Sequence, residues 1–158
     1  MSVLPESRNS TVLPKMHQTQ SSSEKYYIVS VQHLQYLYDA SGCFPSPPRA
    51  IAVISPDNSD IQAPKFSVTK GNGDNTYTIK VNGRDVRRGP GDLIYSFEDG
   101  HTEEWVIIFR EAERAYTIES KDSNRRAWTA PLEPGLLQIR LEPFTATNHR
   151  QLFRFDSL

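Results

Sequence analysis

Two short signatures each occur three times in this chain, in matching order, and this repetition restricts the fold more than any other feature. The first is Tyr-x-Ile, at residues 26–28, 77–79 and 116–118. The second is an aromatic residue followed two positions later by an apolar one, at residues 66–68, 105–107 and 153–155. Alternate residues of a strand face the same side. The outer residues of each signature are therefore predicted to form matched layers of one core, as in a repeat architecture.

From Tyr26 onward, short runs of β-branched and aromatic residues alternate with clusters of Gly, Pro, Asn and Asp, a pattern typical of strands and hairpin turns. No segment keeps apolar residues at helical spacing over three turns. We predict strands at residues 26–31, 36–40, 50–54, 65–69, 76–81, 85–88, 93–97, 104–109, 115–120, 126–130, 136–141 and 152–156. Three four-stranded units are too few for a propeller, which has about four or more blades. The predicted fold is an all-β β-trefoil, in which three four-stranded repeats form a six-stranded barrel capped by three hairpins.

Residues 1–24 differ in composition from the rest of the chain. They are rich in Ser, Thr, Gln and Pro and contain no aromatic residue, so they bury too little apolar surface to offset their ordering entropy. We predict a disordered N-terminal tail over residues 1–24 and one β-trefoil domain over residues 25–158, because a chain of 158 residues suits a single core.

The charge and targeting signals are those of an ordinary globular protein. The net charge is −1, so no global field attracts nucleic acid or an anionic membrane. The basic pairs at 87–88 and 125–126 have acidic neighbours such as Asp92, Asp122, Glu111 and Glu113. Cys43 is the only cysteine, which excludes an intramolecular disulfide. The sequence shows neither a signal-peptide core nor an apolar run that would span a membrane. We expect a cytoplasmic monomer without nucleic-acid or membrane partners.

The residues indicate neither an enzyme nor a metalloprotein. No nucleophile elbow and no Walker loop is present. The Gly-rich segment 71–75 and the acidic segment 57–60 are predicted turns, because the first precedes no helix and the second lacks the Gly and distal Glu of a calcium loop. Carboxylates and cysteine do not stand at metal-ligand spacing from the four histidines, which are His17, His33, His101 and His149. We expect no catalytic residue, no cofactor and no metal.

Loops on the rigid barrel are the expected place of function. The loop at 41–49 contains three prolines, which lower the entropy lost when a partner holds the segment extended. Its candidate residues are Cys43, Phe44, Pro45 and Arg49, and an exposed Phe or Arg would suit a protease pocket. The alternative is a stiff connector whose Phe44 folds onto the barrel.

Three further loops are candidates, each with an alternative reading as an ordinary turn. The first contains Asn82 and Arg84, and its Asn-Gly pair is by itself a strong hairpin signal. The second is the polar segment 121–126. The third is 144–150, with Asn148 and Arg150, whose length would suit insertion into a cleft.

Several segments resemble the fungal β-trefoil serine protease inhibitors, the mycospin group. They are Glu-Glu-Trp-Val-Ile at 103–107, Tyr-Thr-Ile-Glu at 116–119, Ala-Trp at 127–128, Leu-Gln-Ile at 137–139 and Gln-Leu-Phe-Arg-Phe at 151–155. The resemblance covers roughly residues 26–158. It implies an inhibitor of trypsin- or chymotrypsin-like enzymes that inserts one surface loop into the protease cleft as a substrate would. Loops that serve this purpose in the group correspond here to 41–49 and 144–150. Phe44 would favour a chymotrypsin-like pocket, and Arg150 a trypsin-like one.

Two other functions remain open at this point. A related fungal trefoil group inhibits papain-like and asparaginyl proteases, and an Asn between its fifth and sixth strands would correspond to Asn82. Ricin-type trefoil lectins repeat a Gln-x-Trp motif in each unit, and this chain has none. One trefoil scaffold supports unrelated functions, so a carbohydrate-binding protein is the third alternative.

Overall fold

The computed structural model describes residues 23–40, 48–58, 60–122, 124–132 and 138–157. Within these ranges the chain forms strands and two short 3-10 helices, η3 (Pro90–Asp92) and η4 (His149–Gln151). None of the helices in the described ranges is long and apolar enough to cross a membrane. The strands are β1 (Ser23–Ser30), β2 (Gln35–Ala40), β3 (Arg49–Val53), β4 (Phe66–Lys70), β5 (Thr76–Val81), β6 (Arg84–Arg88), β7 (Ile94–Phe97), β8 (Glu104–Arg110), β9 (Ala115–Ser120), β10 (Arg126–Thr129), β11 (Arg140–Pro143) and β12 (Phe153–Asp156).

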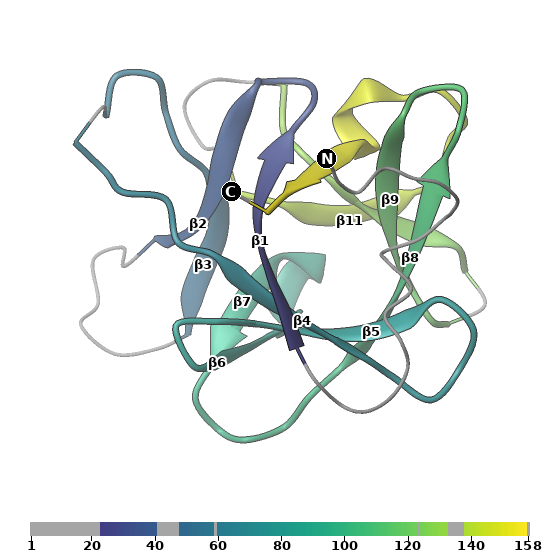
Figure 1. The fold of residues 1–158 in the computed structure, drawn as a ribbon, viewed down its shortest axis with the longest axis horizontal. Coiled ribbons are helices and arrows are strands. Elements are labelled where there is room, and N and C mark those ends of the chain that lie inside the picture. Colours follow the sequence, from purple (N-terminus) through teal and green to yellow (C-terminus); the bar gives the residue numbers. More distant parts are fainter. Residues whose placement is uncertain (1–22, 41–47, 59, 123, 133–137, 158) are drawn as a thin grey trace.

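The strand pairing closes six of these strands into a ring, and Figure 1 shows β1, β4, β5, β8 and β9 around it. Antiparallel pairing runs from β1 to β4, β5, β8, β9 and β12 and returns to β1. The other six form three hairpins, β2–β3, β6–β7 and β10–β11. The protein is a β-trefoil with a six-stranded barrel and three capping hairpins, which confirms the predicted fold.

Two strands, β1 and β11, differ from their predicted bounds by more than one residue. β1 begins at Ser23, which pairs with Thr69, so the first strand includes two residues of the predicted tail; residues 1–22 lie outside the described residues. β11 covers Arg140–Pro143, whereas the predicted strand covers 136–141, of which 136 and 137 lie outside the described residues. The reason is that Ile139 bonds the other two hairpins instead: its N–H donates to the Ile51 carbonyl at 2.9 Å, and its carbonyl accepts from the Ile94 N–H at 3.0 Å.

The repeated signatures form the core, as predicted. Their outer residues are all buried: Tyr26, Ile28, Phe66, Val68, Tyr77, Ile79, Trp105, Ile107, Tyr116, Ile118, Phe153 and Phe155. Rings from different repeats meet edge to face, with centroids 5.7 Å apart for Tyr26 and Phe155 and 5.5 Å apart for Trp105 and Trp128. Burial also raises the pKa of Tyr77 to about 12. Because these positions are enclosed, their side chains serve the core and are not available to a partner.

Candidate functional site

The connection between β2 and β3 leaves the barrel from a fixed base. The two strands pair from Leu37 and Val53 up to Ala40 and Ala50, which holds the two ends of the connection side by side. Arg49, the first residue of β3, also opposes Ser96 of β7. The candidates Cys43, Phe44 and Pro45 lie outside the described residues, whereas Arg49 belongs to the strand at the base of the loop.

Asp39 is a buried carboxylate near the end of β2, next to Ala40, the last described residue before the loop. Its side chain is 6% exposed and binds two residues of the β5–β6 connection. The Asn82 amide donates to Asp39 Oδ1 at 3.1 Å and to Oδ2 at 3.3 Å, and the Arg84 guanidinium donates to Oδ2. Charge-assisted hydrogen bonds of this kind are the strong ones. The candidates Asn82 and Arg84 are thus bound to the fold through their side chains.

The β5–β6 connection is a tight turn, as its Asn-Gly sequence predicts. Asn82 has φ 50° and Gly83 has φ 79°, the positive values that a two-residue type I′ hairpin requires. Asn tolerates this conformation better than most residues with a side chain. This turn brings Asn82 and Arg84 close together, and both side chains reach Asp39 of β2.

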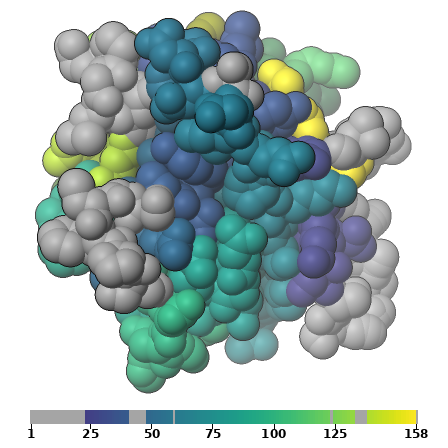
Figure 2. All heavy atoms as spheres, turned by 90° about the vertical axis from the view of Figure 1, so that its left-hand side faces the viewer, coloured from purple at the N-terminus to yellow at the C-terminus, as the bar shows by residue number. Residues whose placement is uncertain are grey.

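A surface hollow of about 500 Å³ lies beside Asp39. It is lined by β2, by Arg49, by Asn82 and by the segment that contains Ile61, Gln62 and Pro64. Figure 2 shows this face, on which the blue surface of β2 and β3 lies between the 55–65 segment and the teal-green surface of β6 and β7. Arg49 Nε is buried without a hydrogen-bond partner among the described residues.

The second candidate loop, between β11 and β12, starts at Phe144, whose ring packs against two arginine side chains. The Phe144 ring lies 4.7 Å from the Arg110 guanidinium and 4.2 Å from that of Arg125. Both arginines bind the buried carboxylate of Glu119, Arg110 at 2.6 Å and Arg125 at 3.4 Å. Stacking of this kind stabilises a partly buried ring, so the first residue of the loop is anchored.

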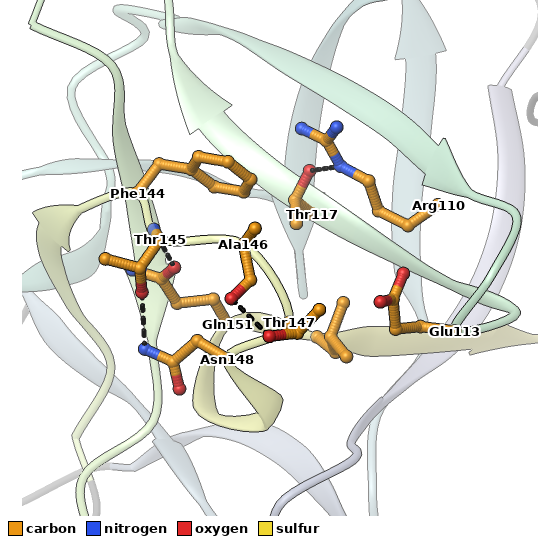
Figure 3. A pocket seen from close by; sticks show the side chains of 10 residues that line it. Arg110, Glu113, Thr117, Phe144, Thr145, Ala146, Thr147, Asn148 and Gln151 are labelled. Carbon is orange, nitrogen blue, oxygen red and sulfur yellow. Dashed lines mark hydrogen bonds between the residues drawn. The ribbon is translucent and has the colours of Figure 1, made fainter.

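The end of the same loop is anchored as well (Figure 3). Gln151, which is 1% exposed, accepts from the Thr145 N–H at 3.0 Å and donates to the Thr129 hydroxyl and the Pro143 carbonyl, both at 3.0 Å. The Asn148 side chain accepts from the Arg150 N–H at 3.0 Å and thereby caps η4. These internal bonds hold the loop in place, and its exposed residues are 145–147 and His149.

Arg150 points back onto the fold. Its Nε donates to the Ala130 carbonyl at 2.9 Å, and its Nη2 lies 3.6 Å from Glu142 Oε2. The two candidates of this loop, Asn148 and Arg150, therefore both make intramolecular side-chain bonds. A protease could take up the Arg150 side chain only after these contacts had been broken.

The basic pairs are paired with acids in the fold. Arg87 binds Asp99 through two bonds of 2.6 and 2.9 Å. This hydrogen bonding, together with the His101 N–H, lowers the pKa of Asp99 to about 2. Arg88 lies 3.3 Å from Asp122, and Arg126 lies 2.7 Å from Asp92. Asp92 and Asp122 offset these cations as the sequence indicated.

The described histidines are separated in the fold: His33 lies in a turn, His101 in a loop and His149 in η4. His33 Nε2 lies 2.6 Å from the Pro131 carbonyl, and the His101 N–H donates to Asp99. Within the described ranges, no group of three or more potential metal ligands comes together.

Sequence reasoning missed the buried polar anchors Asp39, Glu119 and Gln151. One signal could have revealed Asp39. It lies two residues after Leu37, which is fully buried, so strand alternation places a carboxylate on the inward face where an apolar residue is expected. Glu119 gives no such signal, because alternation places it on the face opposite to the core residues Tyr116 and Ile118, and only the structure shows that both faces of β9 are buried.

The comparisons with known proteins agree with this architecture. A family model described as peptidase inhibitor I66 matches residues 18–157. No curated protein sequence is significantly similar to the chain.

Several solved structures share the fold. A proteinase inhibitor from Coprinopsis cinerea has a TM-score of 0.69 at 19% identity, and the match covers 88% of this chain and 100% of that one. A ricin B-like lectin from Macrolepiota procera, in complex with lactose, has a TM-score of 0.64 at 17% identity over 89% of this chain and 100% of the lectin. The designed threefold-symmetric protein ThreeFoil gives 0.63 at 14% identity over 85% and 99%. Identities this low establish the β-trefoil fold alone.

Proposed function

Because this chain belongs to the peptidase inhibitor I66 family, we propose that it inhibits a serine protease by presenting its 41–49 loop to the active-site cleft as a substrate would. One observation favours this loop over the others. The candidate side chains of the competing loops, Asn82, Arg84, Asn148 and Arg150, all bond to the chain's own fold.

The base of the 41–49 loop suits such a mechanism. Ala40 and Ala50 are paired at its two ends, so cleavage of a bond within the loop would leave both new ends attached to one rigid hairpin. Three prolines restrict the segment before it binds. A restricted loop loses less entropy on binding than a flexible one, which favours tight binding and slow release of a cleaved product.

Phe44 is the proposed primary specificity residue, directed at a chymotrypsin-like pocket. It lies near the middle of the loop sequence, and it lies outside the described residues. Arg49 is an unsuitable alternative because it opposes Ser96 within the sheet.

The test is a panel of chymotrypsin, trypsin, subtilisin, papain and legumain, assayed with the purified full chain. We expect nanomolar inhibition of chymotrypsin and weaker or no inhibition of papain and legumain. Inhibition of legumain alone would direct attention to Asn82 and overturn the serine-protease proposal. If no protease is inhibited and a glycan array gives a clear signal, the inhibitor function itself is wrong.

Arg150→Met tests whether Arg150 is an anchor or a specificity residue. We expect the free energy of unfolding to fall by about 1 kcal/mol, because the Ala130 carbonyl loses its hydrogen bond. The inhibition constants for chymotrypsin and trypsin should stay unchanged. Urea denaturation and inhibition assays on the same sample give both values. Loss of trypsin inhibition without loss of stability would instead make Arg150 the residue that enters the protease pocket.

A further inference from the structure

We propose that Asp39 is a positioning residue for the inhibitory loop, and that the β5–β6 turn acts through it as a buttress of the loop base. This inference rests on the proposed function of the 41–49 loop. It concerns a residue in the barrel cap that would not itself touch a protease.

The position of Asp39 in the strand places it next to the loop. Asp39 pairs with Ile51, one step before the last pair of the hairpin, Ala40 with Ala50. Its side chain is 6% exposed, on the same strand face as the buried Leu37. A displacement of Asp39 therefore moves the residue at which the loop starts.

A carboxylate at such a depth requires compensation, since an unpaired buried charge is strongly destabilising. The compensation comes from one turn. Asn82 supplies amide hydrogen bonds of 3.1 and 3.3 Å, and Arg84 supplies a guanidinium whose side chain is 11% exposed. The free energy that favours this pairing also holds the β5–β6 turn against the end of β2.

The same turn reaches the other end of the loop. Arg84 Nε donates to the Ser96 hydroxyl at 3.4 Å, and Ser96 opposes Arg49 where β3 begins. Asp39 precedes the 41–49 loop, and Arg49 is its last residue and the first of β3. Arg84 thus connects to both ends of the connection, directly on one side and through Ser96 on the other.

This arrangement predicts an effect on inhibition beyond its effect on stability. A loop whose base is fixed pays less ordering entropy when it binds a protease, and its scissile bond stays in one geometry. A loosened base should raise the inhibition constant and accelerate cleavage of the loop. Both quantities are properties of the complex that a purely structural role would leave unchanged.

The experiment uses Asp39→Asn and Arg84→Met in the full chain. Asn keeps the shape of Asp but removes the charge, and Met keeps much of the Arg side-chain length. We expect each variant to raise the inhibition constant for chymotrypsin about tenfold, which corresponds to about 1.4 kcal/mol. Loop cleavage, followed by mass spectrometry during incubation with chymotrypsin, should be faster. The double variant should have an inhibition constant no higher than that of the more affected single variant, because both substitutions break the same Asp39–Arg84 interaction.

Glu119→Gln is the matched control. Glu119 is likewise a buried carboxylate bound by two arginines, but it supports the 144–150 loop. It should lower the thermal stability without changing the inhibition constant. Thermal unfolding, followed by circular dichroism, gives the melting temperature of each variant, and every inhibition assay is carried out below it.

Asn82→Gly is the milder variant should Asp39→Asn fail to fold. Glycine accepts the positive φ of this position, and Arg84 remains to pair with Asp39. We expect about a threefold rise in the inhibition constant, smaller than that of Arg84→Met because a neutral donor is lost rather than a charged one.

The outcomes separate the two proposals. If the wild-type chain inhibits chymotrypsin while Arg84→Met and Asn82→Gly keep its inhibition constant and cleavage rate, the buttress role is wrong and the proposed function stands. If the wild-type chain inhibits no serine protease, the proposed function is wrong and the buttress role with it. An equal loss of inhibition in Glu119→Gln would overturn the specific role of Asp39 in favour of general destabilisation.

Discussion

Trp105→Ala is expected to lower the free energy of unfolding by about 3–5 kcal/mol. Trp105 is fully buried in β8 and lies edge to face against Trp128, with ring centroids 5.5 Å apart. Its Nε1 donates to the Val86 carbonyl at 3.1 Å. The substitution removes the packing of a large side chain, leaves a cavity and deprives a buried carbonyl of its hydrogen bond. Each of these effects lowers the free energy of unfolding.

Guanidinium denaturation of the variant and of the wild type measures this loss. Leu132→Ala is the control, because Leu132 is 58% exposed and its loss should change the stability by less than about 0.5 kcal/mol. A Trp105→Ala protein as stable as the Leu132→Ala protein would contradict the assignment of the repeated signatures to one core.

The core could be predicted from the sequence because its signal is local and repeated. The spacing of two residues between Tyr77 and Ile79, or between Phe66 and Val68, depends only on the geometry of a strand. The same spacing recurs in each repeat. The start of β11 could not be predicted in this way, because Ile139, the residue before it, bonds to two hairpins that are distant in sequence.

The loop anchors could not be predicted for a related reason. Asp39 lies 43 residues from Asn82 and 45 from Arg84, and no periodicity links positions so far apart. From sequence, Asn82, Arg84 and Arg150 are polar side chains in turns, and polar side chains in turns are usually solvated. The fold instead uses them to hold its connections in place.

The distribution of anchors among the loops narrows the choice of an inhibitory residue. A side chain that enters a protease pocket must leave its own intramolecular contacts, and this cost reduces affinity. Arg84 and Arg150 would each lose contacts with a carboxylate. Phe44 is the remaining large side chain among the candidates, which makes it the residue to test.

Phe44→Ala is expected to raise the inhibition constant for chymotrypsin roughly 30- to 1,000-fold, the range of about 2–4 kcal/mol found for a central hot-spot residue. The thermal stability should change little, because the paired base of the loop, Ala40 with Ala50, does not depend on this side chain. Phe44→Arg should exchange the specificity, with inhibition gained against trypsin and lost against chymotrypsin, because a charged side chain suits an acidic pocket and not an apolar one.

Phe144→Ala is the matched control for this change. Phe144 stacks on Arg110 and Arg125 at the start of the other loop, so its loss should lower the stability and leave the inhibition constant unchanged. Opposite behaviour of the two phenylalanines would separate a residue that binds the protease from one that positions a loop. Unchanged inhibition by Phe44→Ala together with weaker inhibition by Phe144→Ala would transfer the inhibitory role to the 144–150 loop, where the exposed segment 145–147 would then have to enter the protease cleft.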